Sequence, residues 1–204
     1  SVLAAVMAAT IVAPLATAAE AEVTVGSPDT VPLRNKQNEP AIAMHPLNED
    51  YLAAGANDNI DIAPCGTAEA TPAAPCPFTS GVGVTGVQFS FDGGQNWVQP
   101  TYTGWSARDG TPGFGPIGTL PWYSENGLVA DGDPALAFGP QPGPNGFSWA
   151  NGSRLYYANL TSNLGTKKDE TFKGFEAIYV SRTDNPQVAA QGGVAGKNAW
   201  MQPV

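Results

Sequence analysis

The sequence predicts an all-β protein made of two similar units of four short strands. Two observations favour this fold class. The 204-residue chain contains 24 Gly and 19 Pro, which are typical of turns and extended segments rather than of helices. Four blocks of sequence also occur twice in the same order, as expected when a structural unit is repeated along a chain. Charged residues make up 13% of the chain, against roughly 25% in an average soluble domain, which fits long uncharged loops.

The first pair of repeated blocks is the clearest. Glu39-Pro-Ala-Ile-Ala-Met44 reappears as Asp133-Pro-Ala-Leu-Ala-Phe138. Three further pairs of strand-like blocks follow in the same order: 51–55 with 154–159, 86–90 with 175–181, and 97–100 with 200–203. Each unit therefore has the size and pattern of one blade of a β-propeller. A sandwich of two sheets built from the same eight strands is the alternative.

These blocks divide the chain into segments. An N-terminal extended segment, residues 20–37, precedes the first blade at 38–100. A loop rich in Gly, Pro and aromatic residues, 101–132, leads to the second blade at 133–204. A blade must bury both faces of its sheet against neighbours, and two blades cannot close a ring. We therefore expect the chain to be the N-terminal fragment of a larger propeller.

Residues 1–19 have the pattern of a signal peptide whose start is missing. An apolar run too short to span a membrane is followed by small residues that form an A-x-A cleavage signal. A buried Ala-rich helix is the alternative. The signal peptide predicts a secreted protein with no membrane attachment after cleavage.

The charge balance limits the partners. The formal net charge is −9, with a pI near 4.3, and a nucleic-acid-binding protein would instead carry a basic surface. The same acidic balance gives no general attraction to an anionic sugar. We therefore expect no nucleic-acid partner.

Cys65 and Cys76 flank a loop rich in Pro and Ala. In an oxidising compartment they can form a disulfide, which stabilises a loop of this size by about 3 kcal/mol, while a pair of free thiols is the alternative. Their spacing fits no zinc-binding pattern, so no metal site is predicted from them. His45, the only histidine, lies in a turn-like sequence and is predicted to be an ordinary surface residue.

The segment 101–132 contains aromatic residues on a long connection between blades. Trp105, Trp122 and Tyr123 are candidates for stacking on sugar rings, because long loops on a rigid scaffold often form binding sites. The alternative is that these rings seal one blade against its neighbour.

The most specific motif is Ser90-Phe-Asp-Gly-Gly-Gln-Asn-Trp97, which matches the pattern S/T-x-D-x-G-x-x-W at Ser90, Asp92, Gly94 and Trp97. On this motif the chain resembles the sialidase-like, Asp-box (BNR-repeat) β-propellers. The resemblance implies a structural hairpin turn between the third and fourth strands of a blade. Asp92 would accept hydrogen bonds from the turn backbone, and Trp97 would pack into the blade core. Residues 181–184, followed by Trp200, are similar to a decayed second copy with an insertion.

The resemblance also implies an activity, exo-glycosidase cleavage of extracellular glycans of the sialidase type. Asn38 stands where this family has the first arginine that binds the substrate carboxylate, which is a departure from its pattern. Asp58 and Asp61 follow the second strand, where the family has its acid/base aspartate, and are the candidate catalytic residues. A solvated loop, or an oxygen cluster that binds calcium, explains the same two residues.

Two functions therefore remain open. The first is a secreted glycoside hydrolase that needs no cofactor, although calcium is considered. The second is a non-catalytic propeller that binds a glycan or a glycoprotein through its loops.

Overall fold

The computed structural model describes residues 20–31, 33–65, 79–165 and 171–204. Within these residues the protein is built mostly of antiparallel β-sheet, which confirms the predicted all-β class. The predicted signal peptide and Cys76 lie outside the described residues, so secretion and the disulfide stay predictions. None of the described helices is long and apolar enough to cross a membrane.

The first sheet contains three antiparallel strands in chain order. They are β1 (Gln37–His45), β2 (Asn48–Asp58) and β3 (Thr85–Ser90). The predicted fourth strand of this unit is reduced to a single bridge between Phe89 and Val98. A 3-10 helix, η1 (Asn59–Asp61), follows β2.

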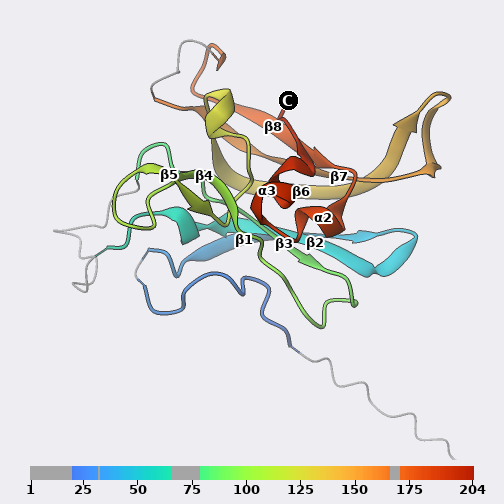
Figure 1. Ribbon diagram of the computed structural model, residues 1–204, viewed down its shortest axis with the longest axis horizontal. Coiled ribbons are helices and arrows are strands. Elements are labelled where there is room, and N and C mark those ends of the chain that lie inside the picture. Colours follow the sequence, from blue (N-terminus) through green and yellow to red (C-terminus); the bar gives the residue numbers. More distant parts are fainter. Residues whose placement is uncertain (1–19, 32, 66–78, 166–170) are drawn as a thin grey trace, which may run out of the picture.

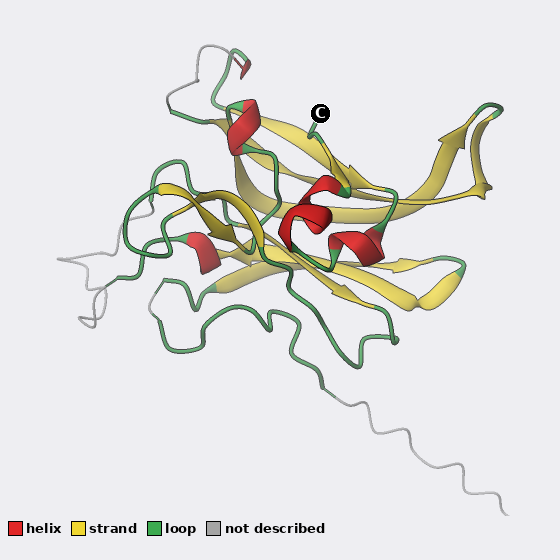
Figure 2. Cartoon of the chain, viewed as in Figure 1, coloured by secondary structure: helices red, strands yellow, loops and turns green. Residues whose placement is uncertain are grey.

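The second sheet contains the four strands expected of a unit, again in chain order. They are β6 (Leu128–Gly143), β7 (Gly146–Asn163), β8 (Glu176–Thr183) and β9 (Trp200–Met201). Two short helices, α2 (Pro186–Ala189) and α3 (Gly193–Asn198), lie between β8 and β9. The hairpin of β6 and β7 extends beyond the rest of the molecule as an arm (Figure 2).

The connection between the sheets is more ordered than the predicted loop. It forms a two-stranded hairpin, β4 (Tyr102–Ser106) with β5 (Gly113–Ile117), and a 3-10 helix, η2 (Ser124–Asn126). Strand β5 is hard to predict from sequence patterns, because three of the five residues in Gly113–Ile117 are Gly or Pro.

The two sheets lie in two layers that face each other (Figure 1), and the main core cluster contains residues from both. The buried Tyr157 of β7 reaches the first sheet, where its hydroxyl donates to the carbonyl of Gly86 at 2.5 Å. Tyr102 of β4 accepts a hydrogen bond from Trp200 Nε1 and donates to the carbonyl of Ala189, each at 2.9 Å. These buried contacts join both sheets, the hairpin and α2.

The repeated Glu/Asp-Pro blocks have the same backbone conformation in both sheets. Glu39 and Asp133 have φ values of 54° and 53°, which are uncommon for residues with a side chain. Register shifts mark a bulge at each position, between Asn38 and Ala41 and between Gly132 and Ala135. The same irregularity at both sites indicates a property of the repeated unit, because bulges redirect side chains at strand ends.

The Asp-box residues form a tight turn directly after β3. Ser90 Oγ donates to Asp92 Oδ1 and accepts from the Gly94 amide, both at 2.9 Å. Asp92 Oδ1 also accepts from the Asn96 amide at 2.9 Å. These are the side-chain-to-backbone contacts expected of an aspartate in such a turn.

Trp97 does not pack into the core, so that prediction is wrong. Its half-buried ring lies back over the turn, and its Nε1 donates to the carbonyl of Gly94 at 3.0 Å. The corresponding Trp200 of the second unit is instead buried in the core. The difference follows from the neighbours, because Tyr102 binds Trp200, whereas the strand after Trp97 is only one bridge long.

The second copy of the box is shifted from the predicted position. The pairing of Leu52 with Ser90 corresponds to that of Leu155 with Thr183, so Thr183 rather than Ser181 occupies the position of Ser90. Ser181 is buried. The expected insertion is present, as the helices α2 and α3.

His45 is buried rather than on the surface, which corrects the prediction. It ends β1 on the side facing the second sheet, and its ring lies edge-on to Phe138 and Trp149 with centroids 5.1 and 5.8 Å apart. Its Nδ1 accepts from the Leu47 amide at 3.1 Å. Burial lowers the pKa of His45, because the charged imidazolium is poorly solvated there.

This burial predicts a pH-dependent contribution to stability. In the unfolded chain His45 titrates near pH 6.5, and in the folded protein it titrates lower, so its contribution is present above pH 6.5 and is lost as the pH falls. The Tm of the wild type should therefore drop relative to that of a His45→Phe variant between pH 8 and pH 5. Because this is the only histidine, a Tm difference that stays constant over this range would contradict the prediction.

Candidate functional site

A polar cleft of about 600 Å³ opens between the two sheets. It lies where β1 and β6 begin and where β2 and β7 end. Amide, hydroxyl or charged side chains belong to nine of its fourteen described lining residues: Lys36, Asn38, Asn57, Asn59, Thr79, Ser80, Asp131, Ser162 and Asn163. Such groups can donate hydrogen bonds to a ligand and also accept them from it.

Asn57 links the two sheets at the rim of this cleft. Its Nδ2 donates to Glu39 Oε2 at 2.8 Å, and its Oδ1 accepts from the Asp133 amide at 2.7 Å. Gly132 makes this approach possible, since it has φ 95° and a Cβ there would collide with the Asn57 amide. The amide therefore fixes the position of one sheet relative to the other.

The cleft and its rim also contain carboxyl groups that protonate more readily than usual. The pKa of Glu39 is raised, because its carboxyl forms a hydrogen bond with that of Asp133. Burial raises the pKa of Asp131, and a hydrogen bond from Ser162 opposes that rise. Carboxylates accept hydrogen bonds from hydroxyls, and a protonated carboxyl can also donate one.

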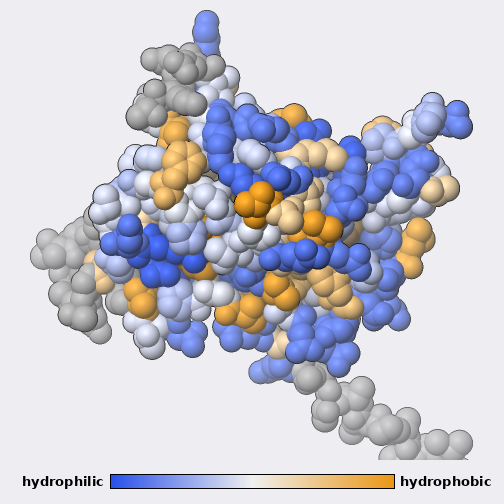
Figure 3. Space-filling model, viewed as in Figure 1, coloured by the Kyte–Doolittle hydropathy of each residue, from blue (hydrophilic) through white to orange (hydrophobic). Residues whose placement is uncertain are grey.

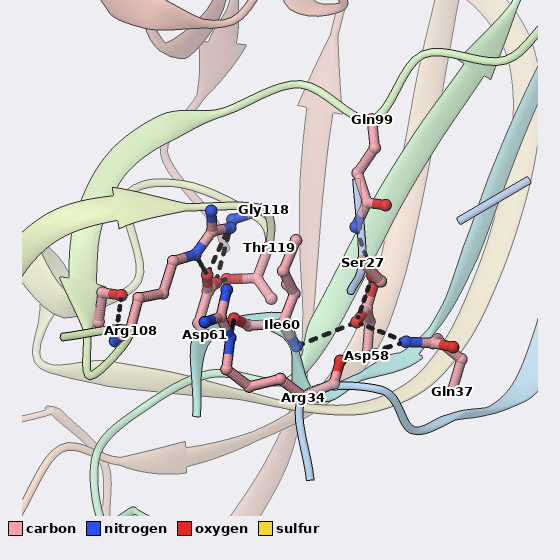
Figure 4. A network of polar contacts seen from close by, with 11 residues as sticks. Ser27, Arg34, Gln37, Asp58, Ile60, Asp61, Gln99, Arg108, Gly118 and Thr119 are labelled. Carbon is pink, nitrogen blue, oxygen red and sulfur yellow. Dashed lines mark hydrogen bonds and ion pairs between the residues drawn. The ribbon is translucent and has the colours of Figure 1, made fainter. Parts of the chain in front are cut away.

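Asp58, a predicted catalytic residue, lies in a network of polar contacts (Figure 4) and is fully buried. It accepts hydrogen bonds from Gln99 Nε2 at 2.7 Å, from Ser27 Oγ at 2.8 Å and from the Ile60 amide at 3.0 Å. Burial raises its pKa, and these hydrogen bonds oppose the rise. The contacts hold the N-terminal segment against the first sheet.

Asp61, the second candidate, is also fully buried (Figure 4). It accepts from Thr119 Oγ1 at 2.6 Å and from the Gly118 amide at 3.0 Å, and it forms an ion pair with Arg108 Nε at 2.7 Å. Burial raises its pKa, and Arg108 opposes the rise. Arg34, which donates to the carbonyl of Ile60 at 2.9 Å, lies nearby.

The solvated loop considered for these two aspartates is therefore wrong, because neither carboxylate is exposed to solvent. The catalytic prediction for Asp58 and Asp61 also has no accessible carboxylate to support it. Among the described residues, no three His, Cys, Asp or Glu side chains are arranged to hold a metal ion.

The three aromatic candidates have different environments. Tyr123 is buried, and its hydroxyl contacts Asn159 Oδ1 at 2.5 Å and Ser181 Oγ at 3.0 Å. Trp122 packs against the core, and its Nε1 donates to the carbonyl of Lys197 at 2.9 Å. These two rings fit the alternative role of sealing the sheets together. The half-buried Trp105 lies beside the exposed Phe114.

Asn38 lines the cleft and is exposed, so the position expected to hold an arginine presents an amide to the ligand space. Among the described residues that line the cleft, Lys36 is the only cation. The cleft therefore lacks the guanidinium groups that bind a carboxylate through two parallel hydrogen bonds.

Sequence reasoning missed the rim formed by Glu39, Asn57 and Asp133. The available signal is the acidic residue before proline in both repeated blocks, Glu39 and Asp133. Comparisons with known proteins find no matching family model, no similar curated protein and no similar solved structure. The candidate function therefore depends on the geometry of the cleft.

The Asp61 contacts predict a structural role for this carboxylate. Asp61→Asn should lower the free energy of unfolding by about 3–5 kcal/mol, because it leaves the guanidinium of Arg108 without its charged partner. Chemical denaturation would measure this loss, and Asp61→Asn/Arg108→Met should recover part of it. Asp184→Asn is the control, since the more exposed pair of Arg154 with Asp184 should contribute about 1 kcal/mol or less. An Asp61→Asn variant as stable as wild type would show that the fold does not need this carboxylate.

Proposed function

We propose that the protein is a secreted β-propeller that binds extracellular glycans in the cleft between its sheets. The observation that carries the proposal is the lining of the cleft by amide, hydroxyl and carboxyl groups on fixed strand ends. Sugar hydroxyls both donate and accept hydrogen bonds, and amides and carboxyls satisfy both needs. Secretion is supported by the signal-like sequence at residues 1–19.

A neutral glycan fits this cleft better than a sialylated one. Lys36 is the single cation among its described lining residues, and Asp131, Glu39 and Asp133 add negative charge in or beside it. The net charge of −9 acts in the same direction. An anionic sugar would be repelled on approach and would find no arginine.

Glycoside hydrolysis is the second candidate function. Glycosidases commonly use two carboxyl groups, one of which must be protonated. The raised pKa of Glu39 matches the protonated group that such an enzyme needs, but a carboxyl in contact with that of Asp133 lies closer than the roughly 5–9.5 Å that separates the two catalytic carboxyls of glycosidases. The sialidase-type specificity implied by the Asp box has weaker support, because Asn38 replaces the arginine.

The propeller architecture is supported by an asymmetry between the two sheets. Leu136 and Phe138 of β6 pack against the core shared with the first sheet. Their counterparts in the repeat, Ile42 and Met44 of β1, are 60% and 58% exposed. Other exposed hydrophobic residues form separate groups among hydrophilic ones on the face seen in Figure 3. Side chains at equivalent positions of repeated units are expected to be buried to a similar extent. We therefore infer that another blade packs over Ile42 and Met44.

Gln88 supports the same inference. It lies on β3 at the floor of a largely apolar groove of about 340 Å³ that also includes Ile42. It is fully buried, and neither polar atom of its amide has a hydrogen-bond partner among the described residues. A buried amide without partners costs about 1–3 kcal/mol. Ser181, at the same register position of the second sheet, has Tyr123 as its partner.

If another blade packs over the first sheet, Ile42 is covered in the full-length protein. Ile42→Asp should lower the free energy of unfolding by about 2 kcal/mol or more, because burial of an isoleucine contributes about 1.5–3 kcal/mol. Val194→Asp is the matched control, since this side chain is 75% exposed and should change stability by about 0.5 kcal/mol or less. Equal, small effects of both variants on the denaturation midpoint would contradict the presence of this neighbouring blade.

Glycan binding predicts retention of the full-length protein on an array of neutral oligosaccharides and weaker retention on their sialylated counterparts. For the strongest neutral ligand, Asn38→Ala should weaken binding about tenfold in calorimetry, because it removes hydrogen bonds worth about 1.4 kcal/mol. Asn145→Ala, an exposed position at the tip of the β6–β7 arm, should leave the affinity unchanged.

Hydrolysis is tested on the same ligands by release of reducing ends. If it occurs at the carboxyl pair, Glu39→Gln should abolish release and retain binding. Absence of retention on every glycan, from protein shown to be folded, would refute glycan binding in the cleft.

A further inference from the structure

A second hollow lies beside the cleft, against the β4–β5 hairpin. Its volume is about 350 Å³, and its apolar lining consists of Trp105, Phe114 and Leu164. Trp105 and Phe114 are paired across the hairpin, with ring planes at 90° and centroids 5.5 Å apart. Phe114 is 64% exposed, which is unusual for so large an apolar ring in a concave position. The hollow thus presents aromatic surface to a ligand.

Polar groups accompany this aromatic surface. Glu125 of η2 lines the hollow, and its carboxylate is fixed by Ser124 Oγ at 3.0 Å and by an ion pair with Lys197. Lys197 is itself held, since its ammonium group donates to the carbonyl of Thr103 at 2.7 Å. The indole N–H of Trp105 has no acceptor among the residues that the structure describes. A fixed acceptor and a free donor therefore lie beside an apolar wall.

The hollow lies directly beside the polar cleft. Ser80, Gly81 and Gly165 line both, so a short and narrow stretch of chain forms the boundary between them. Gly81 has φ 81°, and a Cβ at this position would lie 2.9 Å from Leu164 Cδ1 and 3.4 Å from Trp105 Nε1, so a glycine lets these two side chains pack close to the backbone at the boundary. A ligand anchored in the cleft can thus extend into the hollow.

We propose that this hollow is a second sugar subsite, which binds the apolar face of a neutral pyranose ring, and that the ligand is a glycan chain of at least two units. A pyranose with equatorial substituents has C–H groups on its faces and hydroxyls at its edges. The faces match Phe114 and Trp105, while the hydroxyls match the Glu125 carboxylate and the indole N–H. An entirely apolar ligand would use neither the remaining acceptor capacity of the Glu125 carboxylate nor the indole N–H. The inference rests on glycan binding in the neighbouring cleft.

The two subsites predict that affinity rises with chain length. We would measure calorimetric affinities of the full-length protein for cello-oligosaccharides and N-acetylchito-oligosaccharides of one to four units, whose rings carry equatorial substituents. The affinity for two or more units should exceed that for one unit by about tenfold or more. In addition, Trp105 should change its fluorescence on binding of the longer ligands, and Trp105→Phe should remove that change.

Phe114→Ala separates the second subsite from the first. It should lower the affinity for chains of two or more units about tenfold and leave the affinity for one unit unchanged. Phe147→Ala is the matched control, since Phe147 is 66% exposed on the β6–β7 arm and should affect neither. Asn38→Ala should instead weaken binding of ligands of every length.

The outcomes distinguish the second subsite from the proposed function. Binding that does not depend on chain length, or an equal loss with one unit and with longer chains in Phe114→Ala, would overturn the subsite and leave glycan binding in the cleft intact. If none of these sugars binds and the glycan array is also blank, both proposals are overturned.

Discussion

Burial of the inner faces of the two sheets against each other is the constraint on which the other features depend. Neither sheet can form a core by itself, and the largest fully buried side chains come from all three parts: Phe89 from the first sheet, Tyr102 from the hairpin and Tyr157 from the second sheet. The hydroxyls of Tyr102 and Tyr157 bind backbone carbonyls across these layers. Because these bonds are directional, they fix the relative positions of the strands as well as their separation. That alignment brings the strand ends of both sheets to one rim.

The cleft is a consequence of this alignment. Two bulges, each formed by an acidic residue before proline, place Glu39 and Asp133 at the same rim, where Asn57 connects them. Below the rim, the carboxylates of Asp58 and Asp61 draw the N-terminal segment and the β4–β5 hairpin onto the first sheet. Buried charges with many hydrogen-bond donors are costly to disrupt, so they maintain the shape of the cleft while the groups that line it remain available.

Much of the fold could be predicted from the sequence because it follows from short-range patterns. The repeated apolar blocks 41–44 and 135–138 and the Gly-rich Asp box give strands and turns from a few neighbouring residues. The exposure of particular side chains could not be predicted in this way. His45, Asp58 and Asp61 are polar residues next to turns, and each is buried by a segment distant in sequence. Trp97 and Trp200 have similar local sequences, yet only the second is enclosed, because only Trp200 contacts Tyr102. The candidate site is even harder to predict from the sequence, because Asn57 can bridge the two sheets only where Gly132, a residue in the other unit, leaves space for its amide.

The contact between Asn57 and Gly132 gives the two units a fixed order. Gly132 occupies the position that Asn38 has in the first unit, and Leu160 occupies that of Asn57, as the strand pairings show. If the units were exchanged along the chain, Leu160 would face Asn38 across the rim, and neither the space nor the amide needed for the bridge would exist. The two units are therefore not interchangeable, and a chain in which their sequences were exchanged would lose this rim even if each sheet still formed.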